Sequence, residues 1–76
     1  MRSKRELFGL ARDMAFIEDL LQENINEMTR EELTEEAAKI RNTLLEKNYD
    51  VNTFLHYKDL YKSMTIDGYY NFINTL

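Results

Sequence analysis

Few residues of this chain have the types and spacing that chemistry requires. The only histidine, His56, has one carboxylate a helical turn away, at Asp59, and this pair supplies at most half of a metal site. The chain has no cysteine, and its two serines, Ser3 and Ser63, have no base close to them in the sequence. Two glycines are too few for a phosphate-binding loop. We therefore expect no enzymatic activity, no metal and no cofactor.

One arrangement of basic residues keeps an enzymatic alternative open. Arg5 and Arg12 lie two helical turns apart on one predicted helix face and could together hold a dianion in a dimeric site. No acid–base pair accompanies them, so this alternative ranks last.

The acidic residues are distributed unevenly. Eight acids and one base, Arg30, lie between Glu18 and Glu36, whereas the rest of the chain is mildly positive and the formal net charge is −4. The acids of this stretch are Glu18, Asp19, Glu23, Glu27, Glu31, Glu32, Glu35 and Glu36. Such a stretch is usually a solvated face that favours solubility and, near a helix start, interacts with the helix dipole. The functional alternative is an anionic surface that binds a basic partner protein, with Glu23, Glu27, Glu31 and Glu35 as contact residues.

Aromatic residues are concentrated in the last 28 residues of the chain, where all five tyrosines and Phe72 are found. They can form a core whose hydroxyl groups reach solvent, or a binding surface, since tyrosine gives contact area at low entropic cost. The candidate contact residues are Tyr57, Tyr61, Tyr69 and Tyr70.

The elements that must position these residues are four helices, expected over about 4–27, 30–47, 51–63 and 66–74. Pairs typical of a capping box start the first two helices, and single N-cap residues start the others. These residues are Ser3 with Glu6, Thr29 with Glu32, Asp50, and Thr65. Hydrophobic staples support the last three starts, and Asn48 can end the second helix in a left-handed conformation. The staple pairs are Met28 with Leu33, Tyr49 with Phe54, and Met64 with Tyr69.

Apolar residues recur at helical spacing in all four segments, which predicts one buried face on each helix. Three residues of the first helix fall outside this pattern: Phe16 and Leu20 lie on one flank and Phe8 on the other. A first helix of 24 residues would be about 36 Å long and could not be covered on both flanks by so short a chain. Either the last two helices wrap around it or a second copy of the chain does, and we expect a homodimer.

These features predict a single all-α domain over residues 1–76. The long first helix pairs antiparallel with the second, and two shorter helices pack on this hairpin. No apolar run approaches the length of a membrane span and no signal-peptide core is present, so we expect a cytoplasmic protein.

The function that fits best is a small non-enzymatic protein-interaction module, an inhibitor, adaptor or anti-factor. It would dock its acidic stretch, its apolar-aromatic surface, or both on a partner protein, one with a basic groove for instance. Its Asn- and Tyr-rich composition is compatible with an AT-rich bacterium or its phage. The alternative is a DNA-binding transcriptional regulator that uses the last two helices. Direct nucleic-acid binding is disfavoured because no basic residue follows Lys62.

Overall fold

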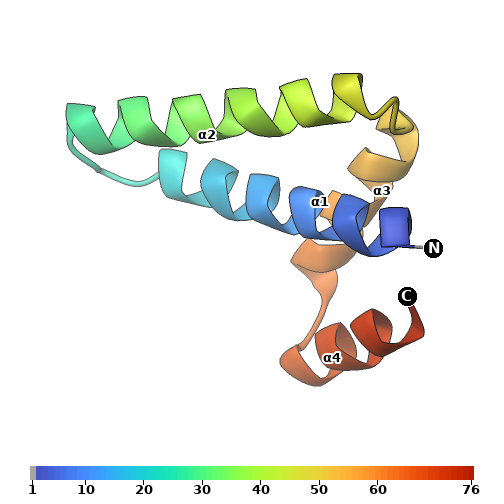
Figure 1. Cartoon of the computed structure of the whole chain (residues 1–76). Helices are drawn as coiled ribbons and strands as arrows, with labels where there is room; N and C mark the ends of the chain where they lie inside the picture. Colours follow the sequence, from blue (N-terminus) through green and yellow to red (C-terminus); the bar gives the residue numbers. More distant parts are fainter. Residues whose placement is uncertain (1) are drawn as a thin grey trace.

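The computed structural model describes the backbone of residues 2–76 and the side chains of residues 4–76. It contains four helices: α1 (Arg2–Leu21), α2 (Glu27–Glu46), α3 (Val51–Ser63) and α4 (Ile66–Thr75). Within the described residues there is no strand, so the fold is all-α as the sequence predicts. Figure 1 shows α1 and α2 side by side as an antiparallel hairpin, with α3 crossing behind α1 and α4 below it.

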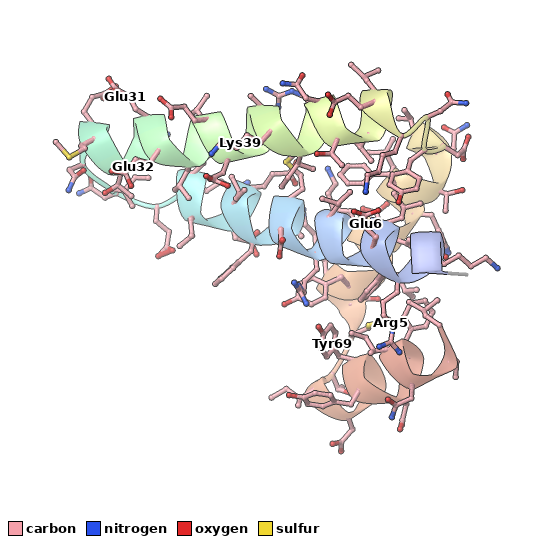
Figure 2. The ribbon with its side chains drawn as sticks, in the orientation of Figure 1. Arg5, Glu6, Glu31, Glu32, Lys39 and Tyr69 are labelled. Carbon is pink, nitrogen blue, oxygen red and sulfur yellow. The ribbon has the colours of Figure 1, made fainter. Side chains whose placement is uncertain are left out.

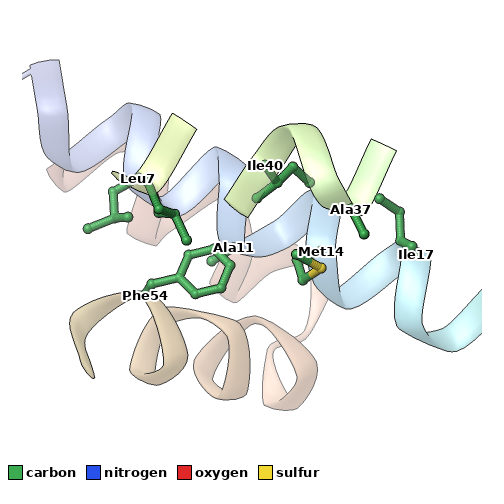
Figure 3. Close-up of a cluster of buried hydrophobic side chains, with 8 residues drawn as sticks. Leu7, Ala11, Met14, Ile17, Ala37, Ile40 and Phe54 are labelled. Atoms are coloured by element: carbon green, nitrogen blue, oxygen red, sulfur yellow. The ribbon is translucent and has the colours of Figure 1, made fainter. Parts of the chain in front are cut away.

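The main core lies where α1, α2 and α3 meet. It contains aliphatic residues of α1 and α2 and one phenylalanine of α3, each less than a tenth exposed (Figure 3). These residues are Leu7, Ala11, Met14, Ile17, Ala37, Ile40, Leu44 and Phe54. The first seven belong to the apolar faces of α1 and α2, because residues three and four apart share one side of a helix.

The α1–α2 connection differs from the prediction. Helix α1 ends at Leu21 and not near residue 27, and α2 begins at Glu27 and not at residue 30. The N-cap of α2 is Asn26, whose side chain accepts a hydrogen bond from the Thr29 backbone N–H at 2.8 Å. Thr29 is therefore inside the helix. Asparagine is as good an N-cap as serine and better than threonine, so the earlier start is favoured.

This shift changes two further predictions. Each hairpin helix has 20 residues, which corresponds to about 30 Å, so α1 is no longer than α2. Met28 lies in the first turn of α2 and is 71% exposed, so it does not form the predicted staple with Leu33.

The other helix ends agree with the sequence. Asp50 and Thr65 cap α3 and α4 by accepting hydrogen bonds from the backbone N–H groups of Thr53 and Gly68. Asn48 has a φ of 55°, the left-handed conformation expected after α2.

The start of α1 is different from the predicted capping box. Ser3 lies within the helix, and its side chain is outside the described residues. Glu6 accepts hydrogen bonds from the Lys47 ammonium group at 2.6 Å and from the Tyr49 hydroxyl. These bonds lower the pKa of Glu6 and connect the start of α1 to the end of α2.

Candidate protein-binding surface

The free end of the α1–α2 hairpin carries the acidic residues. We define the acidic tip as Glu23, Glu27, Glu31, Glu32 and Glu35, all of them exposed. Arg30 stabilises this end of the hairpin. Its guanidinium group donates a hydrogen bond at 3.1 Å to the Leu21 carbonyl, which is among the last carbonyls of α1. The only basic residue of the acidic stretch therefore bonds to the C-terminal end of α1.

The carboxylates of the acidic tip form no ion pairs with the described part of the chain. Glu36, in contrast, pairs with Lys39 at 3.2 Å. Figure 2 shows Glu31 and Glu32 on different sides of the first turns of α2. The acidic tip therefore presents negative charge in more than one direction.

Glu18 belongs to the acidic stretch in sequence but not to the acidic tip in space. Its carboxylate accepts hydrogen bonds from Lys58 at 2.8 Å and Lys62 at 3.2 Å. Partial burial opposes ionisation, but the two lysine hydrogen bonds outweigh it and the pKa of Glu18 is lowered. This carboxylate joins α1 to α3.

The helix dipole accounts for one glutamate of the tip only. The dipole acts within the first turn, which in α2 contains Glu27. Glu31, Glu32 and Glu35 follow that turn, so the predicted dipole interaction of these acids is wrong because the helix begins earlier. Moreover, like charges four residues apart, such as Glu27 with Glu31, destabilise a helix by about 0.2–0.5 kcal/mol per pair. The fold does not gain stability from this cluster.

An apolar side chain lies within the acidic tip. Met28 precedes Glu31 and Glu32 by three and four residues, so the three side chains are neighbours on the surface of α2. The Met28 side chain is 71% exposed. A methionine side chain is flexible and adapts to varied binding surfaces.

Most of the candidate tyrosines contact the chain itself. Phe8 of α1 is 1% exposed, and four aromatic rings surround it with ring centroids within 6.3 Å. These rings belong to Tyr57, Tyr61, Tyr69 and Phe72. The three tyrosines are half-buried, and only Tyr70 is largely exposed, at 62%. The cluster attaches α4 to α1 and α3.

The two arginines with dianion-binding spacing both hold α4. Arg5 donates to the Ile73 carbonyl at 2.8 Å, and Arg12 donates to the Tyr69 hydroxyl at 2.7 Å. Figure 2 shows Arg5 and Tyr69 in the space between α1 and α4. The hydrogen bond to Tyr69, more than the contact with Asp13, raises the pKa of Arg12. We call Arg5, Phe8 and Arg12 the closed flank of α1.

The other flank of α1 remains open. Gly9, Asp13, Phe16 and Leu20 share one helix face by their spacing, and we call them the open flank. Phe16 is 62% exposed, and Leu20 is half-buried. A groove between α1 and α2 is lined by Asp13, Phe16 and Leu20 of the open flank, by the apolar residues Leu10, Ile17, Leu33 and Ile40, and by Glu36, Lys39 and Thr43.

The last helix contains no positively charged side chain. This helix, α4, is the recognition helix of the DNA-binding alternative, and it contains Asp67. Its exposed polar residues include Asn71 and Asn74, which could contact bases but cannot neutralise phosphates.

The described part of the chain offers neither a metal site nor a membrane span. It contains no group of three potential metal-ligating side chains of the histidine, cysteine, aspartate or glutamate types. Within residues 2–76, no helix is both long and apolar enough to cross a bilayer. Comparison with family models, curated proteins and solved structures finds no match to this chain.

Sequence reasoning missed two residues of this surface. With Thr29 as the N-cap, Met28 is predicted to form a staple, and Asn26 is the signal against that cap. Arg30 enters the prediction only as a charge. A base that follows a predicted helix end by a few residues could have indicated its contact with the Leu21 carbonyl.

Proposed function

We propose that this chain is a non-enzymatic protein-interaction module whose acidic tip binds a basic segment of a partner protein. The observation that carries the proposal is the group of exposed carboxylates around an exposed methionine, without cationic partners among the described residues. The fold does not explain this arrangement, because the charges repel one another and only Glu27 lies at the helix start.

The chemistry of the acidic tip selects its partner. Lysine and arginine side chains would pair with the carboxylates, and an apolar side chain among them would cover Met28. A cationic surface that otherwise holds nucleic-acid phosphates has this character. Occupying it would make the chain an inhibitor or anti-factor, whereas binding beside it would make the chain an adaptor.

The hairpin gives this surface a rigid support. The Asn26 cap and the bond from Arg30 to the Leu21 carbonyl fix the connection between α1 and α2. Main-chain order at the tip lowers the entropy lost on binding. Charge then contributes mainly to the association rate, which makes binding depend on salt.

A neutralised tip tests the proposal. In the variant Glu27→Gln, Glu31→Gln, Glu35→Gln, the three carboxylates become amides of the same shape. The matched control is Glu46→Gln, Asp59→Asn, Asp67→Asn, which changes the net charge equally at exposed positions elsewhere. Circular dichroism should give the same helical content for both variants and the wild type.

The readout is retention of a host protein on the immobilised chain, followed by its dissociation constant. We expect the wild type and the control to retain the same protein and the neutralised tip to bind it about tenfold more weakly, since exposed ion pairs contribute about 0.2–1 kcal/mol each. The difference should shrink as salt is raised. Equal binding by all three chains, or no protein retained by the wild type, would contradict the proposal.

A further inference from the structure

The open flank of α1 is a surface that the chain does not cover, apolar at Phe16 and Leu20 and charged at Asp13. Helix α2 packs beside it at Leu10 and Ile17, and α4 lies beyond the opposite flank through its contacts with Arg5, Phe8 and Arg12. Between them, Phe16 remains 62% exposed. An aromatic side chain with this exposure is available to a partner.

Gly9 gives a second, independent observation on the same flank. A Cβ built at Gly9 meets no atom within 4 Å, so no neighbour within the chain requires a glycine there. Its φ is also negative, as in the rest of the helix. Glycine inside a helix is destabilising relative to alanine, and one use that offsets this cost is close approach by another chain or a large side chain.

The two features are complementary to each other. Gly9 leaves a depression and Phe16 and Leu20 form a projection, about 10–16 Å apart along the axis at 1.5 Å per residue. When two copies of α1 lie antiparallel, the depression of each faces the projection of the other. A parallel pair would place depression on depression.

Charge selects the same orientation. The hairpin is strongly anionic at the end that contains Asp19 and Glu23, whereas at the other end Lys4, Arg5 and Lys47 lie near Glu6, Glu46 and Asp50 and the charges nearly balance. An antiparallel pair keeps the two anionic ends apart, whereas a parallel pair brings them together.

We propose that the open flank of α1 binds a second copy of this chain, forming an antiparallel two-fold dimer in which Phe16 of each copy packs over Gly9 of the other. The contact is isologous, so it closes as a dimer and does not propagate. This inference does not rest on the proposed function, because Glu27, Glu31 and Glu35 lie outside the open flank.

Sedimentation velocity of the full chain over a range from about 1 to 500 µM tests the dimer. We expect the mass to rise with concentration from 9.1 kDa to twice that value. Gly9→Leu fills the depression and Phe16→Ser removes the projection, and each change occurs twice in a symmetric dimer. Either should weaken dimerisation about a hundredfold.

The control is Leu45→Ser, which removes an apolar side chain that is 76% exposed on α2, away from the open flank. This variant and the neutralised tip should dimerise like the wild type. A monomer at every concentration, or a dimer unaffected by both Gly9→Leu and Phe16→Ser, would overturn the proposal even if the acidic tip binds its partner.

Cysteine cross-linking tests the orientation without disturbing the depression and the projection together. The chain has no cysteine, so each introduced thiol acts alone. Position 13 lies near the centre of the open flank, so Asp13→Cys should form a disulfide with the same residue of the second copy. Phe16→Cys should form one with Gly9→Cys, and Leu20→Cys should not form one with itself. Efficient self-linkage of Leu20→Cys, as expected for a parallel pair, would overturn the antiparallel arrangement.

Discussion

Each flank of α1 carries a phenylalanine, one buried and the other exposed. Phe8, on the closed flank, is 1% exposed beneath the aromatic rings of α3 and α4, whereas Phe16, on the open flank, is 62% exposed. Both lie outside the apolar face that pairs α1 with α2. The difference shows that this short chain covers one flank with its own C-terminal helices and leaves the other uncovered.

The largest expected effect is a contrast between the two phenylalanines. Phe8→Ala should destabilise the fold by about 3–5 kcal/mol, because it leaves a cavity beneath four rings. Since a chain of this length is expected to have a total stability of about 4–11 kcal/mol, a large share of the protein would unfold. Phe16→Ala should change the stability of the monomer by less than about 0.5 kcal/mol.

Urea unfolding at low micromolar concentration measures this contrast, because it keeps any self-association from contributing. Similar losses of stability in Phe8→Ala and Phe16→Ala would contradict the conclusion that the closed flank is packed and the open flank is not.

A smaller effect should come from the hydrogen bond between Arg12 and Tyr69. Arg12→Met retains the packing of an unbranched side chain but removes the donor, and Tyr69→Phe removes the acceptor. Each should weaken the attachment of α4 by about 1 kcal/mol, with less than additive loss in the double variant. Backbone amide exchange in α4 should quicken about fivefold relative to α2. Unchanged exchange would show that the aromatic cluster alone holds α4.

The smallest effect concerns the two glycines. Gly9→Ala should stabilise the monomer by about 0.5–1 kcal/mol, because the added methyl group meets nothing and alanine favours the helix. Gly68→Ala is the matched change, and its methyl group would lie 3.2 Å from the Thr65 hydroxyl oxygen that caps α4. It should gain less. Thermal unfolding of the two variants compares them, and a larger gain at Gly68 would contradict this description of their surroundings.

Helix type and pairing were accessible from the sequence because they depend on local signals. The period of the apolar residues and the caps at Asp50 and Thr65 each specify an element without reference to distant residues. The failure at the first connection was a competition between two neighbouring caps, Asn26 and Thr29, where the apolar pattern continued through Ile25 and Met28 and favoured the wrong one.

The partition of α1 into a closed and an open flank could not be predicted in the same way. Phe8 and Phe16 differ in no local property, and the choice depends on where α4 turns after Thr65. That direction is set by contacts between residues more than 50 positions apart, such as Arg12 with Tyr69 and Arg5 with Ile73. The sequence predicts the exposure of the acidic tip, but its lack of ion pairs among the described residues depends on the positions of the lysines of α3, which pair with Glu18 instead.

The most direct test of the account places a photo-cross-linking phenylalanine analogue at position 28 in one chain and at position 16 in another. If the acidic tip binds a basic partner and the open flank binds a second copy, position 28 should yield an adduct with a different protein. Position 16 should yield an adduct of twice the 9.1 kDa mass. The same adducts from both positions, or no adduct from position 28 beyond that from exposed position 59, would contradict the claim that the chain functions through its acidic tip.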